Sequence, residues 1–397
     1  MTITTGKGSL GLAAVVAIWS VSAIVSLPGL AISPIMGELD HIFPHAGELE
    51  IEMLESLPSL MIIPVMLLTG QRSVRGNKLR LLGIGTTIFF LSGVGCMLTR
   101  DIVWLIAIGG IMGIGAGMVI PLSTGLIVDY FTGDYRVKQL GISSAINNLT
   151  LVLATALSGW LADIEWHLAF VVYLFPLATL LLLPALRNTH PQPEPPEGAQ
   201  NRQTTINRGV IFGLMLFYFA ITYLSLIVTF NTSFLVERDG MDSSVAGIII
   251  SIFFLAIMAP GFVLNTIVRI FSKRVNLWAL VIMGVGLLVM SLNRHNVLTL
   301  ILGAAMTGVG YGVMQPIIYD KAATNSPPRL ATLALSITMA VNYLAILVAP
   351  FIIEAVGKLF DKASPSFGFI FNGIVTLLLA LVTLLNYRRS RILGSDD

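Results

Sequence analysis

The chain alternates between apolar segments of about 20 residues and short polar connections. A helix rises about 1.5 Å per residue, so each segment is long enough to cross the roughly 30 Å hydrocarbon core of a bilayer. The apolar segments are residues 10–36, 48–70, 79–98, 102–129, 138–162, 167–186, 209–236, 244–270, 277–292, 297–324, 331–357 and 367–387. This pattern predicts an all-α membrane protein with twelve transmembrane helices.

The long polar stretch of the chain lies between the sixth and seventh apolar segments, at residues 187–208. Four prolines and two glutamates fall within residues 191–197. Such a composition is typical of a solvated linker. We therefore predict two six-helix bundles, residues 1–186 and 209–397, joined by a cytoplasmic linker.

The composition supports a membrane protein over a soluble one. Of the 397 residues, 55% are hydrophobic and 11% are charged, whereas a soluble domain carries roughly 25% charged residues. A soluble core could not bury this much apolar surface, but lipid replaces water around a membrane protein. The net charge of +2 gives no indication of a nucleic-acid partner.

Lysine and arginine positions predict the orientation in the membrane, because cytoplasmic loops carry an excess of both. With the N-terminus placed inside, 18 of the 23 Lys and Arg residues fall on the inner side and 5 on the outer side. Both termini are then cytoplasmic, which requires an even number of spans. We expect a multi-pass protein of the plasma membrane, the cytoplasmic membrane in a bacterium.

The two halves of the chain repeat each other. Residues 113–117, Gly-Ile-Gly-Ala-Gly, recur at residues 308–312 as Gly-Val-Gly-Tyr-Gly, 195 residues later. The same offset maps Asn147 onto Asn342. Two repeated six-helix bundles place a binding site at their interface, near the middle of the bilayer.

Several local sequences resemble the major facilitator superfamily, and in particular its drug-exporter branch of proton antiporters. The glycine segment at residues 113–117 is followed by Met118 and Pro121, and the first span contains Leu-Pro-Gly-Leu at residues 27–30. Residues 70–78 occupy the place of the family's signature loop. The resemblance covers nearly the whole chain and implies the fold of that family.

The chain departs from the exporter pattern at several positions. In the signature loop, Val74 stands where an aspartate is usual and Asn77 where a glycine is usual. Gly109 stands where exporters usually place an arginine in the fourth helix. Residues 154–159, Ala-Thr-Ala-Leu-Ser-Gly, are similar to the glycine-proline antiporter motif of the fifth helix but lack its proline.

The resemblance implies an inner gate. In the family, an arginine of the signature loop pairs with the acid that ends the fourth helix and closes the inner side in the outward-open state. In this sequence the corresponding residues are Gly70, Arg72, Arg75, Lys78 and Asp129. The alternative is that the basic residues only anchor the helix ends at the membrane surface.

Glycines are spaced four residues apart in the fourth and tenth predicted spans. Gly109, Gly113 and Gly117 share one helix face, and Gly308 and Gly312 repeat the spacing. Small residues on one face let helices approach closely. They serve either packing alone or a smooth face along which helices shift during alternating access.

One face of the second span is acidic, with Glu48, Glu52 and Glu55 at positions i, i+4 and i+7. An ionised carboxylate as deep as Glu55 costs several kcal/mol unless it is paired, hydrated or protonated. Glu52 and Glu55 are therefore candidates for carrying the coupling proton. The alternatives are a solvated vestibule mouth and simple attraction of cations.

Asp320, in the tenth span, is a third candidate for the coupling proton. It lies beside Lys321, four residues after Pro316. The alternative is that Asp320 and Lys321 belong to the inner membrane interface and anchor the end of the helix.

The resemblance implies that helices 1, 4, 7 and 10 line a substrate cavity. Their polar and aromatic candidates are Trp19, Ser22, Ser26, Ser123, Thr124, Tyr223, Asn231, Tyr311, Gln315 and Tyr319. These predicted spans contain no buried arginine. Such a cavity suits small amphipathic compounds and is unsuited to organic phosphates, which arginine binds well.

Other kinds of chemistry lack support in the sequence. There is no GxxxxGK[ST] segment for nucleotide phosphates, and the 5 histidines have no metal-ligand spacing. No nucleophile, base or metal ligands cluster as in an enzyme. We therefore predict a monomeric secondary transporter in the lipid bilayer that exports small amphipathic compounds, with protons as coupling ion and no other cofactor. The alternatives are a permease or facilitator for a polar metabolite and, more remotely, a membrane sensor or enzyme.

Overall fold

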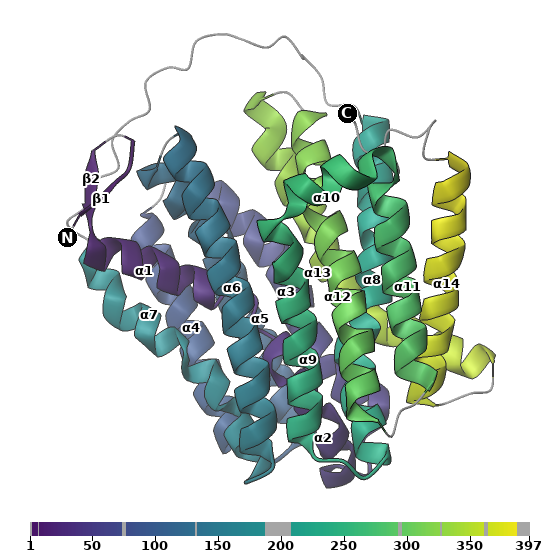
Figure 1. The fold of residues 1–397 in the computed structure, drawn as a ribbon. Coiled ribbons are helices and arrows are strands. Elements are labelled where there is room, and N and C mark those ends of the chain that lie inside the picture. Colours follow the sequence, from purple (N-terminus) through teal and green to yellow (C-terminus); the bar gives the residue numbers. More distant parts are fainter. Residues whose placement is uncertain are drawn as a thin grey trace. The chain divides into compact units, whose positions relative to one another are not determined.

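The structure is a computed structural model that describes residues 2–6, 8–73, 77–131, 133–186, 208–292, 296–325, 328–360 and 364–386 (Figure 1). The chain divides into two compact units. Unit 1 comprises Met1–Ile35 and Ile42–Gly198, and unit 2 comprises Met36–His41 and Ala199–Asp397. The boundaries of the predicted bundles stay a prediction, and most of the predicted linker lies outside the described residues.

Unit 1 begins with a small hairpin, in which Ile3 pairs with Leu10, and continues as helices. Its elements are β1 (Thr2–Thr4), β2 (Ser9–Gly11), α1 (Leu12–Ala23), η1 (Leu30–Ile35), α3 (Glu48–Ser73), α4 (Lys78–Leu98), α5 (Ile102–Tyr130), α6 (Gly133–Ala162), η2 (Trp166–Leu174), α7 (Pro176–Leu182) and η3 (Leu183–Leu186).

The described residues of unit 2 form helices joined by short turns and contain no strand. Its elements are α2 (Met36–Ile42), α8 (Arg208–Arg238), α9 (Ser243–Met258), η4 (Ala259–Phe262), α10 (Leu264–Phe271), η5 (Ser272–Arg274), α11 (Val275–Leu292), α12 (Val297–Thr324), α13 (Pro328–Leu359) and α14 (Pro365–Asn386). Among the described residues of the whole chain, 11 helices are long and apolar enough to cross a membrane.

The first predicted span, residues 10–36, is not one continuous helix. Helix α1 ends at Ala23, and the chain resumes as η1 and then α2. Pro28 lacks the N–H that a helix interior needs, and Gly29 has a φ of +81°, which favours glycine. A Cβ at Gly29 would overlap the backbone carbonyl of Glu55 in α3. The break therefore lets the first span touch α3 at the buried glutamate.

The eighth predicted span, residues 244–270, is also shorter in the structure. The span ends at Phe262, and the next begins at Thr266. Pro260 removes a backbone N–H at this point, so α9 passes into the short η4 and a separate helix, α10. Phe262 and Ile270, on either side of this junction, are largely exposed.

The sequence repeat is visible in the packing inside each unit. A Cβ on Gly113 of α5 would overlap the carbonyl oxygen of Pro58 in α3, and a Cβ on Gly308 of α12 would lie 2.5 Å from the carbonyl oxygen of Phe253 in α9. Phe253 follows Pro58 by the same 195 residues that separate the two glycines. Both units therefore use the same glycine position for the same close helix contact.

A second pair of glycines follows the same rule. Gly117 would clash with the backbone of Ile62, and Gly312 with the backbone of Ile257, again 195 residues apart. Gly109 differs, because the nearest atom to its Cβ position is the Pro58 Cγ at 3.8 Å. That distance is an ordinary van der Waals contact, so the prediction that Gly109 enables close packing is wrong.

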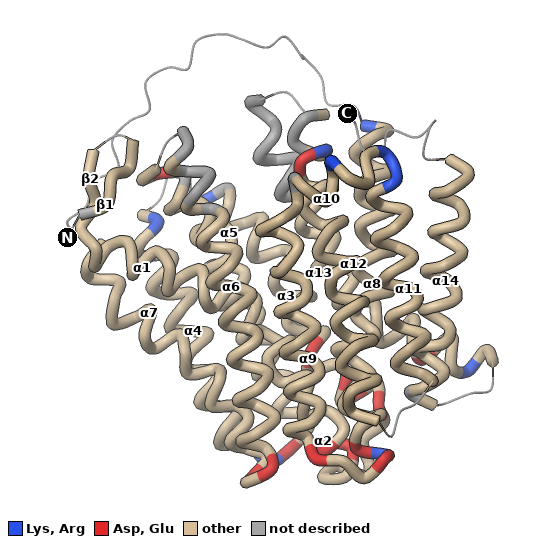
Figure 2. The backbone as a smooth tube through the Cα atoms, in the orientation of Figure 1, with Lys and Arg blue, Asp and Glu red and all other residues tan. Residues whose placement is uncertain are grey.

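Charged residues are distributed unevenly along the helices. Within each unit, most Lys and Arg residues of the described part gather towards one end and most Asp and Glu residues towards the other (Figure 2). This is the kind of distribution that the positive-inside rule describes. Which end faces the cytoplasm stays a prediction.

Candidate functional site

Burial increases along the acidic face of α3. Glu48 is half-buried, whereas Glu52 and Glu55 are 4% and 0% exposed. Glu55 thus lies in a place where an ionised carboxylate needs compensating hydrogen bonds.

The hydroxyl of Ser33, from η1, supplies one such bond. Ser33 Oγ lies 2.8 Å from Glu55 Oε2 and 2.9 Å from the carbonyl oxygen of Leu30. A hydroxyl has one proton to donate but can also accept. Ser33 can therefore donate to an ionised Glu55, or donate to Leu30 and accept from a protonated Glu55. The pair suits both protonation states, and Ser33 was not identified from the sequence.

A polar seam joins the first span to α6 within unit 1. Trp19 Nε1 donates to Gln139 Oε1 at 2.8 Å, and Asn147 Nδ2 donates to Ser26 Oγ at 2.8 Å. The backbone N–H of Ser26 also donates to Asn147 Oδ1 at 3.2 Å. The predicted cavity residues of the first span are therefore engaged in joining two helices.

Serine hydroxyls form the middle of this polar seam. Ser143 Oγ donates to Ser22 Oγ at 2.6 Å, and Ser22 Oγ lies 3.2 Å from Ser123 Oγ of α5. Thr124, the neighbour of Ser123, is exposed instead, because adjacent helical residues point about 100° apart.

Gln139 and Ser143, on the α6 side of the seam, were not identified from the sequence. Gln139, Ser143 and Asn147 are spaced four residues apart and therefore share one helix face. This stripe is as regular as the Trp19-Ser22-Ser26 face of the first span, so the spacing of polar residues was the available signal.

In unit 2, four side chains converge between α8 and α12. Tyr218 Oη lies 2.7 Å from Tyr319 Oη and 3.3 Å from Tyr311 Oη. Gln315 Nε2 donates to Tyr218 Oη at 3.0 Å. The rings of Tyr218 and Tyr319 pack edge to face with centroids 5.5 Å apart. We call Tyr218, Tyr311, Gln315 and Tyr319 the tyrosine cluster.

The tyrosine cluster reaches two further polar groups. Tyr311 Oη lies 3.3 Å from Thr222 Oγ1 and 3.4 Å from Asn342 Oδ1 of α13. Tyr218 and Tyr311 are buried, whereas Gln315 and Tyr319 are partly exposed. The accessible side of the tyrosine cluster is therefore formed by Gln315 and Tyr319.

The two residues predicted from α8, Tyr223 and Asn231, lie on other faces of the helix than Tyr218. Asn231 faces α14, because a Cβ on Gly368 would lie 3.0 Å from Asn231 Nδ2. Tyr223 is buried and lies about 140° around the helix from Tyr218, five residues earlier. Asn231 lies about 140° around the helix from Tyr218. Tyr218, together with Thr222 one turn later, occupies the face that meets α12.

The predicted inner-gate residues are only partly brought together. Lys78 Nζ and Asp129 Oδ2 form an ion pair at 2.6 Å, with side chains 31% and 25% exposed. Arg72 is exposed, and Gly70 has no neighbour within 4 Å of its Cβ position. Arg75 lies outside the described residues. The observed partner of Asp129 is thus a lysine at the start of α4.

Asp320 lies close to the end of α12 and is exposed, whereas the neighbouring Lys321 is 4% exposed. This setting differs from that of Glu55.

Helix α2 packs on the ends of α8 and α9 inside unit 2. The N–H of Gly37 donates to Ser233 Oγ at 2.8 Å, and Ser243 Oγ donates to Glu38 Oε2 at 3.1 Å. A Cβ at Gly37 would lie 2.6 Å from the Ser233 carbonyl oxygen. The absence of a side chain at Gly37 is therefore what allows this contact.

Within the part of the chain that the structure describes, no group of three or more His, Cys, Asp and Glu residues could hold a metal ion. The polar seam and the tyrosine cluster consist of neutral donors and acceptors, whereas α3 carries two buried carboxylates, Glu52 and Glu55.

Comparison with known proteins places these features in context. The sequence model of the Major Facilitator Superfamily matches residues 10–239 and again residues 210–395. The chain is 33% identical over 91 residues to the multidrug transporter protein MdtP of Bacillus subtilis, and 33% identical over 102 residues to multidrug resistance protein 3 of the same organism. These alignments cover 23% and 25% of this chain and only 17% and 20% of the two relatives.

Solved structures with the same fold are more distant in sequence. A POT peptide transporter in complex with sulfate has a TM-score of 0.77 at 13% identity, covering 96% of both chains. A D-xylose-proton symporter has a TM-score of 0.70 at 17% identity, covering 93% of this chain and 96% of the symporter. At these identities the likeness concerns the fold alone.

Proposed function

Because this chain belongs to the major facilitator superfamily of membrane transporters, we propose that it exports small amphipathic compounds in exchange for protons by alternating access. A transporter of this family is not an enzyme. The partial similarity to two multidrug transporters supports the substrate class. We place the protein in the plasma membrane as a monomer with cytoplasmic termini.

The observation that carries the proposal is the buried pair of Glu55 and Ser33. A carboxylate with no exposed surface is costly when ionised and inexpensive when protonated. Ser33 can hydrogen-bond to either form, so each protonation state has a partner. A group of this kind can take up a proton on one side of the membrane and release it on the other.

Protonation of Glu55 would change which state of the transporter is stable. Neutralising a buried charge alters the free energy of its surroundings by several kcal/mol. A two-state system moves from 1:99 to 99:1 with a difference of about 5.5 kcal/mol. Glu52, one helical turn away and also buried, is the natural second site for the same proton. Asp320 is the weaker candidate, because it is exposed.

We assign substrate contacts in unit 2 to the tyrosine cluster. It offers hydroxyl and amide donors together with aromatic ring faces, and it contains no charged group. Neutral donors beside aromatic surface suit amphipathic molecules that carry a hydrogen-bond acceptor or a delocalised cation. The accessible edge at Gln315 and Tyr319 is where such a molecule would first make contact.

We assign the inner gate to Lys78 and Asp129. A partly exposed ion pair contributes only about 0–1 kcal/mol. That is enough to shift a balanced two-state equilibrium several-fold but not to lock it. The gate is then a bias on the conformational equilibrium that substrate and proton binding can overcome.

The alternative is a permease or facilitator for a polar metabolite. Residues 154–159 lack the proline of the exporters' antiporter motif, and a sugar symporter shares the fold. Both alternatives are transporters, so the direction and the proton dependence of movement distinguish them.

The decisive experiment is transport by the purified protein in proteoliposomes, with a panel of fluorescent amphipathic cations and with an imposed pH gradient or none. We expect gradient-driven movement that is lost in Glu55→Gln and retained in Asp320→Asn. Glu354→Gln, which removes a carboxylate paired with Lys358, is the matched control. Movement of the panel that ignores the gradient would favour a facilitator, and no movement of any compound would favour a narrow metabolite permease.

A further inference from the structure

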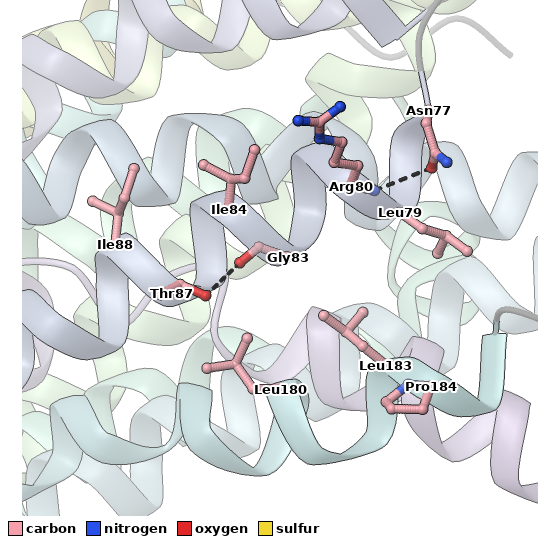
Figure 3. A pocket seen from close by; sticks show the side chains of 10 residues that line it. All are labelled: Asn77, Leu79, Arg80, Gly83, Ile84, Thr87, Ile88, Leu180, Leu183 and Pro184. Atoms are coloured by element: carbon pink, nitrogen blue, oxygen red, sulfur yellow. Dashed lines mark hydrogen bonds between the residues drawn. The ribbon is translucent and has the colours of Figure 1, made fainter.

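A groove of about 720 Å³ lies on unit 1, between α4 and the end of the sixth span formed by α7 and η3 (Figure 3). Its lining includes Asn77 and Arg80 at the start of α4, Ile84 and Ile88 further along that helix, and Leu180 and Leu183 of the sixth span. Figure 3 shows that the side chains of Leu180 and Leu183 face α4 across the groove. None of these residues belongs to the transport site proposed above.

The groove is amphipathic along its length. Its polar side chains Asn77 and Arg80 lie at one end, at the first turn of α4. Further along, Thr87 Oγ1 already donates to the carbonyl oxygen of Gly83 at 2.8 Å. The remaining walls are aliphatic, including Ile84, which is 44% exposed.

Arg80 is the cation that this groove presents. The neighbouring Lys78 is occupied by its ion pair with Asp129 at 2.6 Å. Arg80 is exposed, and among the described residues no carboxylate is paired with its guanidinium. Asn77 Oδ1 accepts from the backbone N–H of Arg80 at 3.1 Å, which leaves the amide group of Asn77 as a further donor. Two donors of this kind at one end suit an anionic oxygen.

The length of the groove matches one leaflet of a bilayer. Asn77 and Ile88 are eleven residues apart on the same helix, which corresponds to about 16 Å. Half of a hydrocarbon core of roughly 30 Å is about 15 Å. An acyl chain that follows the groove would therefore reach the middle of the membrane.

We propose that this groove is a binding site for an anionic phospholipid. The phosphodiester lies against the guanidinium of Arg80 and the amide of Asn77, and one acyl chain lies between α4 and the sixth span. Arginine binds phosphate with two parallel hydrogen bonds, and Lys and Arg at a membrane surface attract anionic lipids. The aliphatic walls at Ile84, Leu180 and Leu183 exclude a fully polar ligand.

Lipid titration of the purified, delipidated full-length protein tests this site. Native mass spectrometry counts bound phosphatidylglycerol and, in parallel, bound phosphatidylcholine. Arg80→Gln should weaken phosphatidylglycerol binding about tenfold, while Arg80→Lys should retain part of it, because lysine keeps the positive charge but loses the two parallel hydrogen bonds of the guanidinium. Arg100→Gln, an exposed arginine outside the groove, should leave binding unchanged.

A second variant tests the groove by shape. The Cβ position of Gly83 is 3.9 Å from Leu183 Cδ1, so the ring of Gly83→Phe would fill the groove. Gly141→Phe, at an exposed helical glycine with no atom within 4 Å, is the matched control. Gly83→Phe should lower binding of both lipids at this site, and Gly141→Phe should not.

Several results would overturn the proposal. Equal affinity for phosphatidylglycerol and phosphatidylcholine would contradict a site for an anionic lipid, and unchanged binding in Arg80→Gln would contradict the role of Arg80 as a headgroup ligand. Unchanged lipid binding in Gly83→Phe would show that the lipid binds elsewhere on the protein. A dimer in the unchanged protein that dissociates in Gly83→Phe would assign the groove to a second copy of the chain. Transport activity does not enter these measurements, so this site and the proposed function can fail separately.

Discussion

The hydroxyl oxygen of Ser33 lies 2.8 Å from a carboxylate oxygen of Glu55, and this contact depends on a break in the first span. The break at Pro28 and Gly29 brings η1 against α3, because Gly29 has no side chain to clash with the backbone of Glu55. A continuous first helix could not place Ser33 in this way. The discontinuity and the buried acid therefore form one structural feature.

Replacing Ser33 by alanine should slow proton-driven transport by about tenfold, because a hydrogen bond to a charged group is worth roughly 1.5–3 kcal/mol. The loss is larger for the ionised form of Glu55, because a hydrogen bond to a charged group is stronger than one to a neutral group, so release of the proton on the inner side becomes harder. Raising the pH inside proteoliposomes should restore part of the rate. Ser20→Ala, which removes a hydroxyl bonded only to the carbonyl of Ala17 in the described structure, is the control. Equal behaviour of both alanine variants would contradict a role for Ser33.

Replacing Gly113 by alanine should destabilise the protein by about 1–3 kcal/mol, because the new methyl group overlaps the carbonyl of Pro58. Since α3 carries Glu55, transport should fall as well. Gly109→Ala should be tolerated and gain up to about 1 kcal/mol of helix stability. Thermal unfolding in detergent measures both. Similar melting temperatures for the two variants would contradict the close contact seen here.

The same measurement applies in unit 2, where Gly312 meets the backbone of Ile257. Gly312→Ala should lower the melting temperature about as much as Gly113→Ala does, because both glycines occupy the same position of the repeat. Gly261→Ala, at a glycine with no atom within 4 Å, is the control. A harmless Gly312→Ala would show that the two units do not depend on this contact equally.

Replacing Tyr218 by phenylalanine should weaken binding of transported compounds by about fivefold to tenfold. The variant keeps the ring but removes the oxygen that Tyr311, Gln315 and Tyr319 share, and a hydrogen bond contributes roughly 0.5–1.5 kcal/mol. Tyr223→Phe, on another face of α8, should have little effect. Fluorescence titration with a transported dye measures both affinities. A larger effect at Tyr223 would move the substrate site away from the tyrosine cluster.

Replacing Asp129 by asparagine should increase access from the inner side, because it removes the ion pair with Lys78. A membrane-impermeant thiol reagent can report this at Thr124→Cys, since Thr124 is exposed on α5 and the native Cys96 is buried. We expect labelling about threefold faster in Asp129→Asn and near the original rate in Asp129→Glu, in line with the modest energy of a partly exposed pair. Unchanged labelling would assign Lys78 and Asp129 to anchoring alone.

Features that depend on one helix could be predicted from the sequence. The Tyr311-Gln315-Tyr319 stripe lies on one face because a helix repeats every 3.6 residues, and all three side chains contact Tyr218 in the structure. The burial of Glu55 follows from its depth in an apolar segment. In both cases the position of the residue along its own helix was enough to make the prediction.

Features that depend on a neighbouring helix were not predictable in this way. Asn231 and Tyr218 are both polar residues of α8. Tyr218 contacts α12 and Asn231 faces α14, and only the packing of these two helices against α8 decides this. Likewise, the sequence does not indicate that Gln139 accepts a hydrogen bond from Trp19, because the two residues belong to different helices. The sequence pattern of one helix predicts which face a residue lies on, but not which other helix packs against that face.

By itself, the sequence determined the membrane class of this protein, its family resemblance and its internal repeat, because hydrophobic length and helical period are local properties of the chain. The tertiary structure decided where the first span breaks, which hydroxyl faces Glu55, and which lysine meets Asp129. Those outcomes depend on close approaches between segments far apart in sequence, such as Gly29 against Glu55 and Gly113 against Pro58. Steric fit between two surfaces fixes such contacts, and neither surface specifies them alone.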